Sequence, residues 1–444
     1  MGYWLPTLAP AVLRDGAFVP EENDVMAGDG LSDDLGRVGD PVAERVVADL
    51  VAEDRLGEVN RLLREWRSND QQIPEGLPAG LREFLEQARR AVPEWADQTR
   101  LRRVREFFED DGIHIGAALA LGSMALAYAV PLGAKMMSLT HRLRYPERRM
   151  ANTAQFVFDL MRPDPFGPNS QFVVSAVKVR LIHATIRHHL RASGSWDEEN
   201  DKVPASQEHL LIVWLALSVQ VIDFLGRLRV TVTEQEAEDY LHTWRVAGTY
   251  LGIRAEAMPD TIAQARHVLA DALARGGGPS PEGAELTRHL LALYADAVPG
   301  RLFDGIVPAY LRHLIGKDIA EWLEVPSSRF WQVALGGYLF VVGLVEKVED
   351  RSRIGRWVLD KAGQLIYDLE FRILTQGKST HLELPLELAG YNPAPLQAAA
   401  MAPVERAGEE PVIPVEELMA ETVPEPRDST EHDPATAQEP TTRS

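Results

Sequence analysis

The sequence predicts an all-α protein. Apolar residues recur at helical spacing along most of the chain, alternation with a period of two is nearly absent, and proline or glycine clusters separate the periodic segments. Short strands are conceivable only at 229–233 and 380–386. The chain has 444 residues and 45% apolar content, which is enough for a large helical core.

The first 40 residues are acidic and loop-like, and helices are expected from that point onward. Asp40 is a good N-cap residue, and Pro41 suits the first helical position. Pro146 can begin a later helix that ends before Pro163. The helical segments expected in this part of the chain are, in order, 42–66, 80–92, 98–110, 113–140 and 147–161.

One of these segments is long enough to cross a membrane. Residues 115–134 form a run of 20 residues without a charge. Much of the run is alanine and glycine, and Pro131 interrupts it, so its transfer into lipid is only modestly favourable. We therefore expect no transmembrane span here, but a buried segment whose small residues allow a neighbour or a flat ligand to approach closely.

The second half of the chain continues as helices and ends in a tail. The loop at 163–170 is followed by a helix at about 171–191 and a loop at 193–202. Further helices are expected at 208–228, 234–253, 260–274, 281–297, 311–323, 330–348 and 352–375.

The tail has a composition typical of disordered segments. Residues 393–444 contain nine prolines and eleven acidic residues, with no helical stripe long enough to pack. Residues 414–421 could form a short partner-binding helix, although the tail could equally serve only to keep the protein soluble. The predicted organisation is an N-terminal extension at 1–40, a helical domain at 41–390 and a disordered, acidic, proline-rich tail at 391–444.

Charge and cysteine content exclude several classes of function. The formal net charge of −20 argues against nucleic acid and anionic membranes as partners. The absence of cysteine excludes disulfides, iron–sulfur clusters and thiolate-ligated haem. The N-terminus lacks a basic region before a long apolar run, so we expect a cytoplasmic protein.

His183 is the first candidate for a functional residue. In a helix over 171–191 it falls within an apolar stripe, with Arg180 and Arg187 at the edge of that stripe. A lone histidine on an apolar face is usually a core residue satisfied by a hydrogen bond. Alternatively, it is an axial ligand to haem iron, and the two arginines pair with the haem propionates rather than forming ordinary surface ion pairs. The apolar residues of the stripe are Phe172, Ala176, Val179, Ile182, Ile186 and Leu190.

Two further pairs have suggestive spacing. Arg149 and Thr153 are four residues apart and share a helical face, so they could hydrogen-bond a ligand such as dioxygen in one pocket. The alternative is a salt bridge and a threonine bonded back to its own helix. Asp239 and His242 have the spacing of a di-iron ligand pair, but the sequence offers no convincing second Glu-x-x-His.

Four stretches together are more specific than any single residue. In order, they read LAYAVPLGAKMMSLTHRL, RRMANTAQFVFDLM, SAVKVRLIHATIRHHL and AEDYLHTWRVAGTYLGI. This series resembles the latex clearing proteins (rubber oxygenases) and the MpaB-type oxygenases. The resemblance implies a globin-like helical core around b-type haem, with His183 as the iron ligand and Arg149 and Thr153 on the distal side. The implied reaction is cleavage of a carbon–carbon double bond in an isoprenoid by dioxygen.

The sequence departs from the rubber-cleaving members at two positions. Those members have a lysine where this chain has Asn152, and a glutamate near the position of Gly133. We therefore expect a smaller apolar substrate than rubber. Two other functions stay open at this point: a haem-free or catalytically silent helical protein that binds an apolar ligand or a partner, and a haem peroxidase or dehydrogenase.

Overall fold

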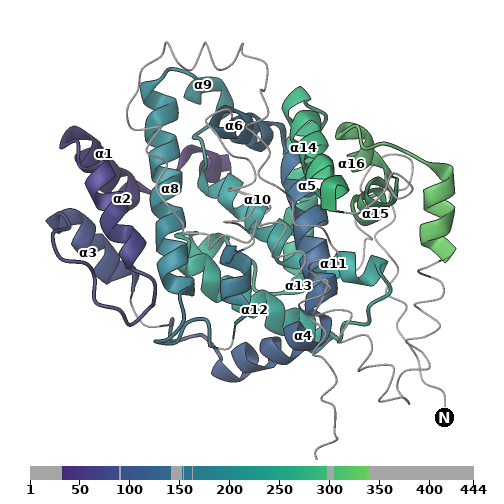
Figure 1. The fold of residues 1–444 in the computed structure, drawn as a ribbon, viewed down its shortest axis with the longest axis horizontal. Helices are drawn as coiled ribbons and strands as arrows, with labels where there is room; N and C mark the ends of the chain where they lie inside the picture. The colour runs from purple at the N-terminus through teal and green to yellow at the C-terminus, as the bar shows by residue number, and fades with distance from the viewer. Residues whose placement is uncertain are drawn as a thin grey trace, which may run out of the picture. The chain divides into compact units, whose positions relative to one another are not determined.

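The computed structural model describes residues 33–89, 92–141, 153, 155–162, 164–297, 305–337 and 339. These residues form helices and connecting turns, and no strand is found among them (Figure 1). The predicted all-α class is confirmed. The strand considered at 229–233 is wrong, because this stretch is a turn and a non-repetitive connection that leads into the next helix. The strand considered at 380–386, the helix at 352–375 and the whole tail at 391–444 lie outside the described residues.

The N-terminal layer consists of η1 (Asp33–Arg37), α1 (Pro41–Ala52), α2 (Leu56–Glu65) and α3 (Ala79–Ala88). Helix α1 begins where the sequence predicted, since the backbone N–H of Ala43 donates to Asp40 Oδ1 over 3.2 Å. The single helix expected at 42–66 is wrong. Asp54 has a φ of 54°, which is in the left-handed region, so the chain turns between α1 and α2.

The uncharged segment at 115–134 is not one straight helix. Helix α4 (Gln98–Ala117) continues through the π-helical η2 (Ala118–Ser123) into α5 (Met124–Tyr128). Helix α6 (Pro131–His141) then departs at a bend of 104°.

The small residues of this segment do allow close packing, as predicted. A methyl group added to Gly122 would lie 2.7 Å from Cδ2 of Phe224, so the ring rests directly on the helix backbone. By length and composition, the stretch Gln207–Arg227 could also cross a membrane. However, 67% of its most apolar part is buried inside the protein.

The remaining helices follow after a turn-rich connection. The helix expected at 208–228 breaks at Ser218, whose hydroxyl donates back to the carbonyl of Trp214 over 2.8 Å. The helix expected at 311–323 is interrupted at Gly316, which has a φ of 83°. The observed elements are α8 (Phe172–Ala192), α9 (Glu198–Asp201), α10 (Gln207–Leu217), α11 (Val219–Arg227), α12 (Glu234–Tyr250), η3 (Ala255–Ala257), α13 (Ile262–Gly276), α14 (Pro281–Ala297), α15 (Ile306–Ile315) and α16 (Lys317–Trp322).

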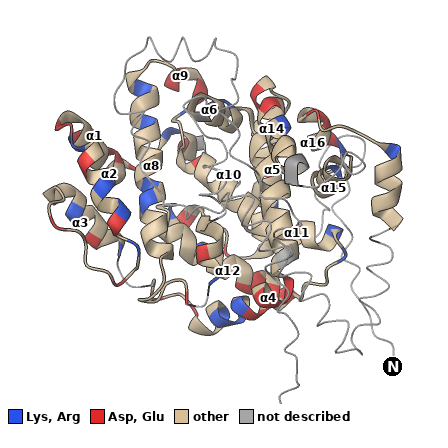
Figure 2. Cartoon of the chain, viewed as in Figure 1, with Lys and Arg blue, Asp and Glu red and all other residues tan. Residues whose placement is uncertain are grey.

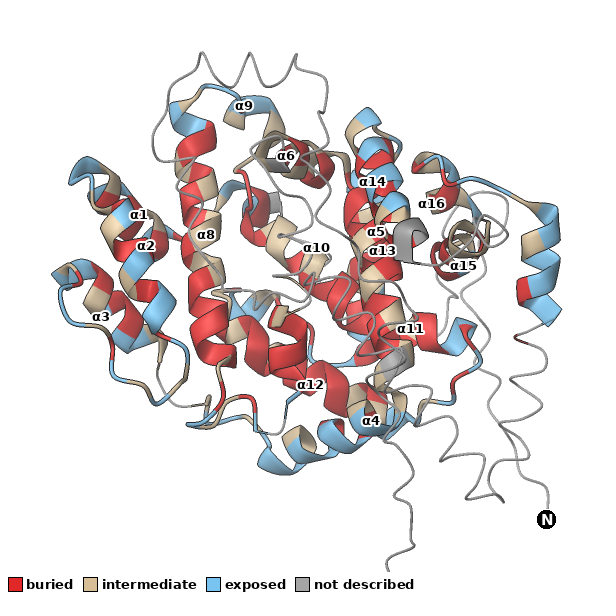
Figure 3. Cartoon of the chain, viewed as in Figure 1, coloured by how far each residue is buried: buried red, intermediate tan, exposed pale blue. Residues whose placement is uncertain are grey.

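Helix α8 is central to the arrangement. It packs against α1 and α3 on one side and also contacts α12, which in turn packs along α4. Figure 3 shows buried residues along most of α8 and α12, with half-buried residues on part of α8 and α10. The side of α8 that faces α1 is thus fully packed, and a different side stays accessible.

Candidate functional site

His183 lies on the accessible side of α8. Together with Val179, Ile182 and Ile186 it forms a half-buried stripe on one face, whereas the residues around this stripe are mostly buried. Figure 2 shows charged residues on α1 to α4, on α9 and α14 and on α8 itself, while α5 and α10 are almost free of them. The neighbours of His183 in the stripe are apolar, and His183 is half-buried rather than fully buried.

The imidazole of His183 is neutral and has no hydrogen-bond partner among the described residues. Burial, reinforced by the positive charge of Arg187 and by His209, lowers the pKa of His183 to about 3. Within the part of the chain that the structure describes, no group is hydrogen-bonded to its ring. It is therefore not a core histidine satisfied by a hydrogen bond. A neutral imidazole with an available ring nitrogen is the form that binds a metal.

The two arginines that flank His183 point toward α1. Arg180 donates through Nε and Nη2 to both carboxylate oxygens of Asp40, over 2.7 and 3.1 Å, and stacks on the ring of Phe84. Arg187 is fully buried and its Nε lies 2.8 Å from Oε1 of Glu44. Both guanidinium groups therefore form ion pairs, as the alternative interpretation expected, but these pairs are shielded from solvent rather than exposed.

Arg187 keeps unused donor capacity. Its Nη1 donates to the carbonyl of Ala205 over 2.8 Å, while Nε and Nη2 are buried without a hydrogen-bond partner, although Nε lies at ion-pair distance from Glu44. Arg180 uses Nε and Nη2 on Asp40. The propionate role stays a prediction for both arginines.

The predicted distal residues are only partly visible. Arg149 and Asn152 lie outside the described residues. Thr153 belongs to the helical turn that precedes 155–160, is half-buried and takes part in an interaction of its own. The distal roles of Arg149 and Thr153 stay predictions.

Two polar residues were not singled out from the sequence. The first is His209 on α10, whose protonation would lower the pKa of His183. The only feature of the sequence that could have pointed to His209 was its position at the start of an apolar run. The second is Asp159, a fully buried carboxylate that accepts hydrogen bonds from Gln155, Gln171 and Ser175 over 2.8, 2.6 and 3.1 Å. Burial raises the pKa of Asp159 despite these donors.

Asp239 and His242 form a structural cluster instead of a metal site. Arg100 and Arg103 donate to Asp239 over 2.8 and 2.6 Å, which ties α4 to α12. His242 Nε2 accepts a hydrogen bond from the backbone of Asp97 over 2.9 Å. Among the described residues, no three His, Asp or Glu side chains come together as metal ligands.

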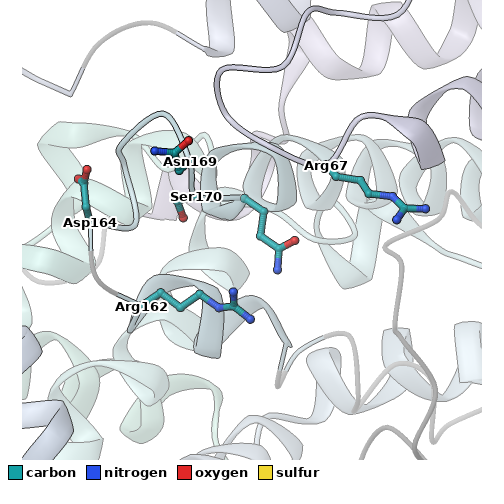
Figure 4. Close-up of a pocket in the computed structure, with 6 residues that line it drawn as sticks. Arg67, Arg162, Asp164, Asn169 and Ser170 are labelled. Carbon is teal, nitrogen blue, oxygen red and sulfur yellow. The ribbon is translucent and has the colours of Figure 1, made fainter.

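An open pocket of about 390 Å³ lies beside the first turn of α8. Arg67 and Arg162 approach it from separate segments, as Figure 4 shows, and its lining is polar. The pocket does not contain His183. An apolar ligand would gain little there, because the polar groups of the lining would lose water without new partners. The remaining lining residues are Asp164, Asn169, Ser170 and Gln171.

The fold and the site define an all-α protein that presents, on an apolar helical face, a neutral imidazole to which no described residue is hydrogen-bonded. Residues 105–344 match the family described as "ER-bound oxygenase mpaB/B'/Rubber oxygenase, catalytic domain". A rubber oxygenase of Streptomyces sp. (strain K30) is 34% identical over 309 residues, which cover 68% of this chain and 74% of that protein.

A solved structure agrees with this match. Latex Clearing Protein LCP in the closed state has 29% sequence identity and a TM-score of 0.70, with 81% of this chain and 96% of that chain covered. The protein belongs to the MpaB/rubber oxygenase family, as the ordered motifs predicted, and is an oxygenase by this membership.

Proposed function

We propose that the protein is a b-type haem-dependent oxygenase that acts on an apolar substrate of isoprenoid type. The observation that carries the proposal is the unpaired, neutral imidazole of His183 on a half-buried apolar stripe of α8. Membership of an oxygenase family supports the reaction class. The identity of the substrate rests on the resemblance to isoprenoid-cleaving relatives and on the apolar surroundings.

The described residues suit a haem. A haem is a flat apolar group that carries its own four nitrogen ligands, so one imidazole from the protein is sufficient to hold the iron. His183 offers that imidazole, and Val179, Ile182 and Ile186 offer an apolar surface beside it. The buried, unpartnered Nη2 of Arg187 would suit one of the propionate carboxylates.

The residues of the candidate site would each have one part in the reaction. When bound, the haem supplies the activation of dioxygen. His183 would hold the group, and the apolar stripe would bind the hydrocarbon substrate and exclude water. Arg149 and Thr153 would hydrogen-bond on the opposite side, as predicted from the sequence. The cytoplasmic location also stays a prediction.

Absorption spectroscopy tests the cofactor. The purified protein, loaded with haemin if necessary, should show a Soret band. His183→Ala should weaken haem binding by more than about 100-fold, since even residues that only support a metal ligand contribute about 10- to 100-fold. His188→Ala is the matched control, because it removes an imidazole from another face of the same helix. A protein that stays colourless with haemin would contradict the proposal.

Oxygen consumption with a polyprenyl test substrate separates the remaining functions. The oxygenase should consume dioxygen with this substrate and turn over little peroxide, and a peroxidase should do the reverse. Arg149→Ala should slow oxygen consumption by at least about 100-fold if this residue stabilises developing charge on the distal side. Unchanged turnover in this variant would show that the distal assignment is wrong.

A further inference from the structure

A second imidazole lies near His183 but belongs to a different helix. His209 is in the first turn of α10, where its backbone N–H donates to the N-cap hydroxyl of Ser206 over 3.3 Å. The two imidazoles are electrostatically coupled, since protonation of His209 would lower the pKa of His183. The helix start holds His209 at a defined place on α10.

The surroundings of His209 resemble those of His183. The side chain is half-buried, and Leu210 and Val213 on the same side of α10 are half-buried apolar residues that pack against the core. No group in the described structure is hydrogen-bonded to the ring. Burial lowers the pKa of His209 to about 4, so the imidazole is neutral and has one N–H donor and one acceptor nitrogen.

Gly133 of α6 makes room for this imidazole. A methyl group added at Gly133 would collide with Cε1 of His209 and lie 3.2 Å from its Nδ1. A side chain at residue 133 would therefore displace the ring. On the same helix, one turn further on, Met137 packs into an apolar cluster together with Ile186 of α8. Helix α6 thus contacts α10 at His209 and shares an apolar cluster with α8.

We propose that His209 is a second ligand-facing residue of this site, which donates a hydrogen bond to the polar end of the molecule that the haem binds. A neutral imidazole left without a partner among apolar side chains costs free energy unless a ligand satisfies it. Nearby Leu210 and Val213 have no polar side-chain atom to offer. This role rests on the proposed haem function, because the bound molecule is held by the haem.

Cyanide binding to the ferric, haem-loaded protein tests the role. Cyanide is a small anion whose free end accepts a hydrogen bond, so the loss of a donor should weaken its binding. His209→Ala should raise the Kd of cyanide at least about tenfold, as expected for a hydrogen bond to a charged group. His209→Gln keeps an N–H donor at similar reach and should restore part of the affinity. His188→Ala should bind cyanide like the wild type.

A second variant keeps the test independent of the stability of His209→Ala. Gly133→Val retains the imidazole but displaces it, so it should raise the Kd of cyanide in the same direction. An unchanged or lower Kd in His209→Ala and Gly133→Val would overturn the role of His209 while the Soret band leaves the haem assignment intact. A wild-type protein without a Soret band would overturn both.

Discussion

His242 of α12 and His183 of α8 both have strongly lowered pKa values, but only His242 has a hydrogen-bond partner in the described structure. His242 accepts from the backbone of Asp97 and meets the ring of Trp95 edge-on, with centroids 5.7 Å apart. His183 has neither kind of contact among the described residues. The two helices therefore place similar imidazoles in opposite situations.

The polar groups around the two histidines differ in the same way. Near His242, the carboxylate of Asp239 is 1% exposed and is met by two arginines and a glutamine. Burial would raise the pKa of Asp239, but hydrogen bonds from Arg103 and Arg100 outweigh burial and lower it. Near His183, the second imidazole, His209, has no hydrogen-bond partner among the described residues either. The bonded carboxylate and imidazole of α12 stabilise the fold, whereas the two unbonded imidazoles are available to a ligand.

The largest effect on stability should come from the paired region. Asp239→Ala leaves Arg100 and Arg103 without their shared carboxylate and should lower the free energy of unfolding by about 2–4 kcal/mol, a range reduced for the partial exposure of both arginines. Urea unfolding measures it. Glu109→Ala is the control on α4, the helix that carries Arg100 and Arg103, because its pair with Arg105 is exposed and should contribute at most about 1 kcal/mol. Equal effects would show that the Asp239 cluster is no more than a surface ion pair.

Substitutions at two glycines test whether the core is packed more tightly than the candidate site. Gly122→Ala forces a methyl group against the ring of Phe224 in the core and should destabilise the protein by about 1–3 kcal/mol. Gly133→Ala meets the ring of His209, which can rotate on its half-exposed side, and should cost less than about 1 kcal/mol. Thermal unfolding of both variants measures the two losses of stability. A larger cost at Gly133 would mean that His209 is tightly packed rather than ligand-facing.

Lowering the pH should destabilise the folded protein through the protonation of His242. Its pKa is about 4 in the folded protein and about 6.5 when unfolded, so the folded state binds fewer protons between these values. The stabilising contribution is complete above about pH 6.5 and declines as the pH falls toward 4, by at most about 1.4 kcal/mol per pH unit.

The variant His242→Gln isolates this contribution, since glutamine can still accept the hydrogen bond from Asp97 but does not titrate in this range. Urea unfolding at pH values between about 7 and 5 should show a shallower loss of stability in the variant than in the wild type. The same pH dependence in both proteins would mean that His242 is protonated or exposed in the folded state.

The smallest effect on stability is expected at the candidate functional site. Without haem, His183→Ala removes no hydrogen bond that the described structure contains, so the free energy of unfolding should change by less than about 0.5 kcal/mol. His242→Ala should cost about 1 kcal/mol, because it leaves a backbone N–H unpaired. Urea unfolding of the two variants and of the wild type, all without haem, measures both changes in the free energy of unfolding. A large loss in His183→Ala would identify this residue as part of the packed core.

The helical class and the main site residue were accessible from the sequence because both depend on local periodicity. Helical spacing alone places His183 among Val179, Ile182 and Ile186, and the cap at Asp40 begins a helix at the predicted residue. The ordered motifs led to the family, which the comparisons confirm over residues 105–344. The breaks at Asp54 and Ser218 were missed, since a single residue with unusual backbone angles leaves the apolar pattern on either side intact.

The sequence by itself determined an all-α chain with one imidazole on an apolar helical face, because both follow from residues a few positions apart. Only the tertiary structure decided what each polar group meets. It brought Asp40 to Arg180 across 140 positions of the chain and His209 to Gly133 on another helix. It also gave His242 a hydrogen bond and, within the part of the chain that the structure describes, gave His183 none. Such pairings depend on how helices pack in space, and no periodicity along the chain records that packing.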